Sequence, residues 1–219
     1  MPSQNVLKLR EECFGGTLFD VVSCKRVYVN YAEFKSIEHN HKLDDCLASE
    51  LGMSGRVDIT KPAWIPDFNF SAPDTVFFEV TRACNLRCIH CFNNSGVKTR
   101  DELTLEKCVL VIEDLVKTGV QEIRFTGGEP MVLEGIEELL FCASSLNLRI
   151  SMGTNAVLAT TEKVEGLAKF LHMAVVSIDG TEERHDIIRG KGAFKKTLEG
   201  MDNFLARDVK VRVNTVIMR

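Results

Sequence analysis

The sequence predicts an α/β protein, in which a partial β/α barrel of parallel strands follows a small winged-helix-like α+β domain. Three observations predict it. From residue 75 onward, apolar runs alternate with helical stretches, as in parallel sheets covered by helices. Cysteines, glycines and polar side chains follow these runs, at the strand ends where such folds place active sites. Before residue 53, three short strands precede two helices.

The first predicted domain covers residues 1–52. Alternation predicts strands at 6–10, 18–22 and 26–30, and helical spacing follows at 31–38 and 43–51. This order outlines a winged-helix module, a fold that often binds DNA. The segment holds six basic and eight acidic side chains, the wrong sign for binding phosphates, so we expect no nucleic-acid partner. A peptide added as a strand on the sheet edge fits the charge better; a lid that packs on its neighbour is the alternative.

Residues 53–74 are predicted to be a linker. Three prolines within this segment prevent a helix. Its aromatic content is too high for a flexible tether, so we expect the chain to run extended with these rings buried on the next domain. The three aromatic residues are Trp64, Phe68 and Phe70.

The barrel is predicted at residues 75–219 from alternating strands and helices. The strands are at 75–80, 122–125, 148–152, 174–178 and 210–217, and the helices at 102–118, 131–145, 160–171 and 193–207. Right-handed crossovers would make these strands parallel. The carboxyl ends of all five strands would then lie on one face.

Three cysteines follow the first barrel strand with C-x3-C-x2-C spacing: Cys84, Cys88 and Cys91. Thiolates favour iron–sulfur clusters or zinc. A cluster held by three cysteines keeps one iron open for an exchangeable ligand, as a catalytic cluster requires. A zinc site with His90 as fourth ligand and a set of unrelated buried thiols are the alternatives.

Composition places the chain in a reducing compartment. The sequence has eight cysteines but no secretory signal region and no apolar run of about 18 residues. We therefore expect a cytoplasmic protein with reduced thiols and no membrane segment. The formal net charge of −4 also argues against a basic membrane-binding surface.

A glycine turn follows the second barrel strand at Gly127-Gly128-Glu129. Glycine lets a backbone approach a ligand closely, and Glu129 could accept hydrogen bonds from an ammonium group. The alternative is a tight strand-to-helix turn, with Pro130 starting the helix.

Polar residues also follow the third and fourth strands. Thr154 and Asn155 either serve the site or cap the helix that begins near 160. Ser177 and Asp179 could bind hydroxyl groups, or Asp179 could belong to a turn. Arg189 offers a fork suited to a carboxylate, with a surface ion pair as the alternative.

Together these motifs resemble the radical S-adenosylmethionine (SAM) enzymes over roughly residues 75–219. The resemblance implies a [4Fe–4S] cluster on the three cysteines, with SAM chelating the open iron. One electron then cleaves SAM into methionine and a 5′-deoxyadenosyl radical, which takes a hydrogen atom from the substrate.

The resemblance also implies a role for each matching residue. Gly127, Gly128 and Glu129 would bind the methionyl amino group, and His90 would lie near the adenine. Ser177 and Asp179 would contact the ribose or the methionyl end, and Arg189 would pair with the SAM carboxylate. Asn155 lies in Thr154-Asn155-Ala156, where relatives often have Thr-Asn-Gly.

The segments 9–16 and 72–91 look like those of radical SAM peptide maturases with an N-terminal precursor-recognition domain, similar to the chaperone of pyrroloquinoline quinone synthesis. The implied partners are a ribosomally made precursor peptide, whose leader docks on the N-terminal sheet, and an electron donor such as flavodoxin or ferredoxin. Relatives usually have a sixth strand and often an auxiliary-cluster domain, so we expect a core truncated after the fifth strand.

Two other functions stay open. A radical SAM enzyme acting on a small-molecule cofactor or haem precursor would share the same motifs. A non-catalytic iron–sulfur regulator would use the N-terminal module to bind DNA, against which the acidic balance of residues 1–52 argues.

Overall fold

The computed structural model describes residues 6–218. Residues 1–5 and 219, at the outer ends of the predicted 1–52 and 75–219 segments, lie outside the described residues. The chain divides into two compact units. The first holds the chain up to Val76 with Leu110–Ile123 and Ala143–Arg149, and the second holds the rest. Within residues 6–218 no helix is long and apolar enough to cross a membrane.

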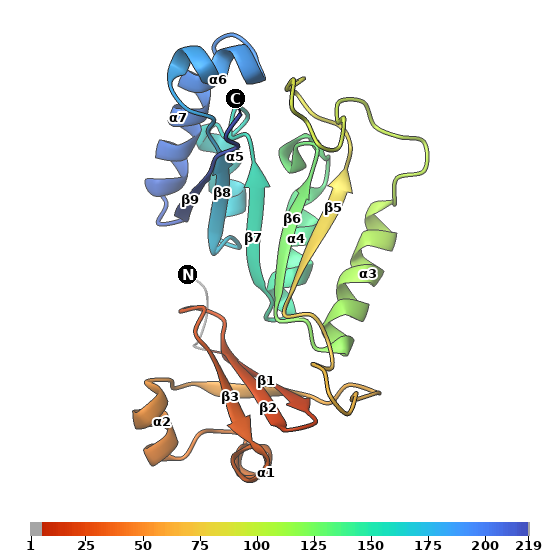
Figure 1. Cartoon of the computed structure of the whole chain (residues 1–219), viewed down its shortest axis with the longest axis vertical. Helices are drawn as coiled ribbons and strands as arrows, with labels where there is room; N and C mark the ends of the chain where they lie inside the picture. The colour runs from red at the N-terminus through yellow and green to blue at the C-terminus, as the bar shows by residue number, and fades with distance from the viewer. Residues whose placement is uncertain (1–5, 219) are drawn as a thin grey trace. The chain divides into compact units, whose positions relative to one another are not determined.

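The N-terminal sheet has four strands in the order β3-β2-β1-β4 (Figure 1). Its elements are β1 (Val6–Glu12), β2 (Gly15–Asp20), β3 (Arg26–Asn30), α1 (Tyr31–Asn40), α2 (Asp45–Leu51) and β4 (Arg56–Thr60). β1 pairs antiparallel with β2 and parallel with β4. The predicted strands and helices before residue 53 are therefore present, and the winged-helix assignment itself stays a prediction.

One face of this sheet packs on the two helices. Leu7, Leu9 and Leu18 are fully buried together with Phe34 of α1. Asn30 begins α1 with a reciprocal capping box, in which its side chain accepts from the Glu33 amide. The alternation of β1 thus buries its odd-numbered residues against the helices.

The other face of β1 carries charged residues that are also buried. Arg10 is 1 % exposed, and its guanidinium donates to Glu12 Oε1 at 2.6 Å and to the carbonyl of Gly119 at 3.1 Å. Asp74 Oδ1 accepts from the same guanidinium at 3.0 Å. This network ties β1 to the start of β5 and to the turn after α3, because a buried guanidinium must be paired.

The predicted linker at 53–74 contains a strand, β4, that sequence reasoning missed. The expected burial of its aromatic rings is wrong: Trp64 is 73 % exposed and Phe68 is 93 % exposed. Phe70 instead meets Phe14 and Tyr28 at ring-centroid distances of 5.9 and 5.7 Å. The rings contact each other on the surface.

The second sheet has five strands in the order β5-β6-β7-β8-β9 (Figure 1). The strands are β5 (Thr75–Thr81), β6 (Glu122–Gly127), β7 (Arg149–Thr154), β8 (Met173–Ser177) and β9 (Lys210–Asn214). The connecting helices are α3 (Leu105–Thr118), the 3-10 turn η1 (Pro130–Val132), α4 (Ile136–Ser145), α5 (Thr161–Ala168), α6 (Glu182–Arg189) and α7 (Ala193–Leu205).

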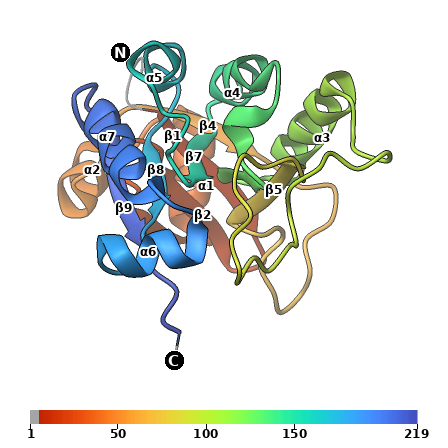
Figure 2. The same cartoon turned by 90° about the horizontal axis from the view of Figure 1, so that it is seen from above.

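The predicted parallel β/α architecture is confirmed. β8 pairs parallel with both β7 and β9, and α4, α5 and α7 lie along one side of the curved sheet (Figure 2). Helix α6 was not predicted, because its sequence is mostly polar and carries only a short apolar stripe. The strand ends lie on one face, as predicted.

The burial of Lys8, on the charged face of β1, can be tested through the pH dependence of stability. Its side chain is 4 % exposed, with Nζ 3.4 Å from the carbonyl of Leu146. Burial lowers the pKa of Lys8 from 10.5 to about 8, and attraction by Asp58 opposes this only in part. Because the unfolded chain then binds more protons between pH 8 and 10.5, the free energy of unfolding rises across that window.

We expect this rise to be about 3 kcal/mol, measured by urea unfolding at each pH. In Lys8→Met the contribution disappears and stability at pH 7 increases, while the exposed Lys42→Met control follows the wild type. A wild-type profile identical to that of Lys8→Met would contradict the burial of a charged amine.

Candidate functional site

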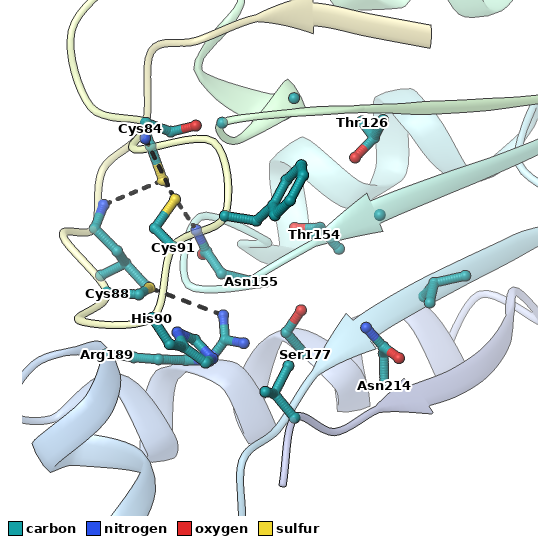
Figure 3. A pocket seen from close by; sticks show the side chains of 18 of the residues that line it. Cys84, Cys88, His90, Cys91, Thr126, Thr154, Asn155, Ser177, Arg189 and Asn214 are labelled. Atoms are coloured by element: carbon teal, nitrogen blue, oxygen red, sulfur yellow. Dashed lines mark hydrogen bonds between the residues drawn. The ribbon is translucent and has the colours of Figure 1, made fainter. Parts of the chain in front are cut away.

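The three cysteines lie on one loop after β5. Cys84, Cys88 and Cys91 are free thiols and partly buried. The loop is anchored at its base and near its middle: the amide of Cys84 donates to the carbonyl of Gly96 at 3.2 Å, and the amide of Ile89 donates to the carbonyl of Ile188 of α6 at 3.0 Å. The three side chains point into the same pocket (Figure 3).

Each sulfur has a nitrogen donor beside it. The Leu86 amide lies 3.4 Å from Cys84 Sγ, and the Ser95 amide lies 3.3 Å from Cys91 Sγ. Burial raises the pKa of Cys84 and Cys88. Burial also acts on Cys91, but hydrogen bonds led by those from Ser95 outweigh it and lower its pKa. These donors stabilise negative charge on sulfur, as thiolate ligands require.

The glycine turn packs directly on the strand that precedes the cysteines. The amide of Gly128 donates to Thr81 at 2.7 Å, and that of Glu129 donates to Ala83 at 2.9 Å. A Cβ at Gly127 or Gly128 would lie 2.2 Å from a carbonyl oxygen of this segment. Only glycine fits at these two positions, because the turn after β6 packs directly on the backbone after β5. This supports the alternative of a tight turn. Both glycines also line the pocket.

Glu129 lies behind the residues that line the pocket. It is 1 % exposed and is absent from the described lining. Its carboxylate accepts from Thr154 Oγ1 and the Asn155 amide, both at 2.8 Å, and from the Met131 amide at 3.2 Å. Burial raises the pKa of Glu129, with these hydrogen bonds acting in the opposite direction. Glu129 joins the turn after β6 to the turn after β7.

That bond places Asn155 beside the cysteine loop. Asn155 Nδ2 lies 3.9 Å from Cys84 Sγ and 2.9 Å from Asn85 Oδ1. Capping of the next helix by Thr154 and Asn155 is wrong, because Thr160 is the N-cap of α5. Ala156 adopts a left-handed φ of 59°, the conformation that glycine adopts without strain.

A second buried carboxylate, Asp179, holds the opposite wall. Asp179 Oδ2 accepts from Arg189 Nε at 2.6 Å, and Oδ1 accepts from the Val216 amide at 3.0 Å. Burial alone would raise the pKa of Asp179, but these partners, Arg189 first, lower it. His90 Nε2 lies 3.0 Å from Oδ2 without an aligned hydrogen bond to the described residues. The surface ion pair considered for Arg189 is instead a largely buried one.

The pocket among these groups has a volume of about 300 Å³. Of the predicted residues, those that line it are Cys84, Cys88, His90, Cys91, Gly127, Gly128, Asn155, Ser177 and Arg189. Glu129 and Asp179 lie outside the described lining. Figure 3 shows Thr126, Thr154, Ser177 and Asn214 along the strand ends, facing the same space.

Sequence reasoning missed several lining residues, including Phe77, Arg124 and Asn214. A signal existed for Arg124. Arg124 and Thr126 are two residues apart on β6, and alternate residues of a strand share a face. Once Thr126 is placed at the turn, the same face must carry Arg124.

The donor set fits an iron–sulfur cluster. Three free thiols around one pocket, each with a nitrogen donor beside it, are the ligand type that iron–sulfur clusters use.

A parallel β/α sheet with three cysteines after one strand and a glycine turn after the next defines a class of cluster-dependent enzymes. The chain belongs to the radical SAM superfamily, which matches residues 78–219. Membership implies a [4Fe–4S] cluster and SAM as cofactors.

Two curated relatives differ in what they make. The sporulation killing factor maturation protein SkfB of Bacillus subtilis (strain 168) is 35 % identical over 147 residues, which cover 66 % of this chain and 36 % of SkfB. The Fe-coproporphyrin III synthase of Methanosarcina barkeri is 32 % identical over 166 residues, covering 74 % of this chain and 42 % of that protein. The chain spans less than half the length of either relative.

Among solved structures, SuiB of Streptococcus suis bound to S-adenosylmethionine has the same fold. The TM-score is 0.73 at 19 % identity, over 97 % of this chain and 56 % of SuiB. The likeness extends beyond the barrel into the N-terminal part.

The glycine turn gives a matched pair of variants. Gly128→Ala puts a Cβ 2.2 Å from the Ala83 carbonyl, whereas a Cβ at Gly153, also in the pocket, meets nothing nearer than 3.5 Å. We expect Gly128→Ala to lower the free energy of unfolding by about 2 kcal/mol or more and Gly153→Ala to change it little. Chemical denaturation measures both, and equal stabilities would contradict the close strand contact.

Proposed function

We propose that the chain carries the SAM-cleaving site of a radical SAM peptide maturase. In this proposal Cys84, Cys88 and Cys91 hold the [4Fe–4S] cluster. The observation that carries it is one pocket shared by three free cysteine sulfurs and the Gly127–Gly128 turn. When bound, the cluster and SAM supply a 5′-deoxyadenosyl radical for hydrogen abstraction.

The chain's own groups bind and orient. The Leu86 and Ser95 amides stabilise the ligating thiolates. Gly127 and Gly128 leave room for the methionyl amino group of SAM. The hydroxyl of Ser177 offers a polar contact to its ribose.

Four other residues take part in the proposal. Arg189 Nη1 lies 4.0 Å from Cys88 Sγ, and this arginine would pair with the carboxylate of SAM. His90 would lie along the adenine. Glu129 and Asp179 act by position, since both carboxylates are occupied within the chain: Glu129 holds the backbone amide of Asn155, and Asp179 holds the Arg189 side chain.

A precursor peptide is the proposed substrate, because SkfB is named as a maturation protein and SuiB has been solved with its precursor peptide SuiA. Residues 1–52 would form the recognition domain and 53–74 the linker to the core. The edge strand β3 is open to an added strand. The half-exposed Tyr28 on β3 contacts Phe14 and Phe70, which would cover apolar side chains of the leader. Flavodoxin or ferredoxin would supply the electron.

A small-molecule substrate is the second candidate, favoured by the similarity to Fe-coproporphyrin III synthase. The two candidate functions differ in one expectation: only a peptide maturase should bind a peptide through β3. Tyr28→Ala should weaken binding of a leader-like peptide at least tenfold if the substrate is a peptide. Unchanged binding, or none in the wild type, would favour the small molecule.

The central test is anaerobic reconstitution with iron and sulfide, followed by SAM and dithionite. We expect the wild type to bind about four irons and to form 5′-deoxyadenosine, detected by mass spectrometry. Cys84→Ser should lose the cluster's absorbance and lower product at least 100-fold, since a thiolate ligand is lost. Cys46→Ser, an exposed cysteine on α2, is the matched control.

Two results would contradict the proposal. Equal cluster loading by Cys84→Ser and the wild type would remove Cys84 from the ligand set. A fully loaded wild type that forms no 5′-deoxyadenosine would remove SAM cleavage.

A further inference from the structure

A buried hydroxyl on the cysteine loop lacks a well-aligned acceptor. Ser95 is four residues after Cys91, is 8 % exposed and lines the pocket. Its Oγ is buried without an aligned hydrogen bond to the described residues. A buried hydroxyl that finds no acceptor destabilises the folded chain. A group in the pocket that offers an acceptor to Ser95 would therefore bind more favourably.

The backbone on both sides of this hydroxyl is fixed. The Ser95 amide lies 3.3 Å from Cys91 Sγ. The next residue, Gly96, donates its amide to the carbonyl of Arg82 at 2.8 Å and accepts from the amide of Cys84 at 3.2 Å. These bonds tie Ser95 to the third cysteine on one side and to the segment before the first cysteine on the other. Rotation of its own side chain is then the main freedom that the hydroxyl keeps.

The Ser95 hydroxyl lies on the Cys91 side of the pocket. Burial would raise the pKa of Cys91, but the amide of Ser95 and then its side chain lower it. An interaction of this kind requires the hydroxyl to be close to that sulfur. The same residue thus offers Cys91 a backbone donor and a side-chain donor.

The side-chain donors at the other two sulfurs have partners elsewhere. Asn155 Nδ2, 3.9 Å from Cys84 Sγ, also donates to the side chain of Asn85 at 2.9 Å. Arg189, whose Nη1 lies 4.0 Å from Cys88 Sγ, is bonded to a buried aspartate. The Ser95 hydroxyl has no such competing acceptor among the described residues. It can therefore turn fully toward sulfur.

We propose that the Ser95 hydroxyl donates a hydrogen bond to sulfur at the Cys91 corner of the cluster and thereby raises the cluster's reduction potential. Reduction adds negative charge that spreads onto the sulfurs, and a hydrogen bond stabilises that charge more in the reduced state than in the oxidised state. The inference rests on the proposed function, and concerns how readily the site takes up the electron that SAM cleavage consumes. With this donor in place, a weaker reductant suffices.

The test measures a potential rather than turnover. The full chain is reconstituted anaerobically without SAM and titrated electrochemically, while electron paramagnetic resonance follows the reduced cluster. Ser95→Ala should move the midpoint potential about 59 mV more negative, the one-electron equivalent of a tenfold less favourable reduction. Ser95→Thr keeps the hydroxyl and should keep the midpoint. Thr126→Val, which removes a hydroxyl elsewhere in the lining, should also leave it unchanged.

Exchange into D2O gives a second readout on the same samples. In the reduced wild type we expect a hyperfine coupling to an exchangeable deuteron that Ser95→Ala lacks, while couplings to the backbone amides stay in both. Equal midpoints in Ser95→Ala and the wild type, or identical deuteron couplings, would overturn the inference. A shift of the same size in Thr126→Val would also overturn it, because any lost hydroxyl would then have the effect.

The potential is measured without cleaving SAM, so the two proposals fail separately. A loaded wild type that forms 5′-deoxyadenosine, with no shift in Ser95→Ala, removes only the role of Ser95. A shift in Ser95→Ala without 5′-deoxyadenosine from the wild type removes SAM cleavage and keeps the hydrogen bond. A wild type that binds no cluster overturns both.

Discussion

The contact between the Gly127–Gly128 turn and the strand before the cysteines is the constraint on which the site depends. The Gly128 and Glu129 amides bond to the carbonyls of Thr81 and Ala83, so β5 and β6 stay paired up to the residue before Cys84. No side chain fits at either glycine without moving backbone. The pairing fixes where the cysteine loop begins. It also turns the Glu129 carboxylate inward, where it accepts the Thr154 hydroxyl and the Asn155 amide. This one close approach thus positions both the cysteine loop and the turn after β7.

Two buried carboxylates, Glu129 and Asp179, hold residues that line the pocket, and their pKa values shift in opposite directions. Glu129 is bonded to peptide amides and a hydroxyl, so burial dominates and raises its pKa. Asp179 is bonded to a guanidinium, which lowers its pKa despite burial. A buried charge requires compensation, and Arg189 provides it for Asp179. The same arginine then reaches toward Cys88. Through the Val216 amide, Asp179 also holds the segment after β9 against the pocket.

The parallel sheet and the convergence of strand ends could be predicted, because both follow from apolar periodicity and from the alternation of strands and helices along the chain. The cysteine spacing and the glycine pair needed only neighbouring residues. What could not be predicted depends on pairing across the sheet. Arg124 and Phe77 meet only when β5 and β6 are in register, and β4 forms only against β1. Trp64 and Phe68 were expected to be buried, since apolar content alone does not specify a surface for them to cover. Glu129 has the chemistry of a ligand group, yet its partners lie 25 and 26 residues further along the chain.

The lining of the pocket changes in character along the strand direction. Thiols and Arg189 lie at the loop end, hydroxyls and an amide from Thr126, Ser177 and Asn214 follow, and Arg124 lies deeper. From Gly127 to Arg124 the strand covers roughly 10 Å. A co-substrate held at the loop end would place its reacting carbon over these neutral groups, which add no competing charge. Radical chemistry requires the reacting atoms in near-contact, and a neutral stretch of strand ends beside the loop provides room for that contact without a charged group at the reacting carbon.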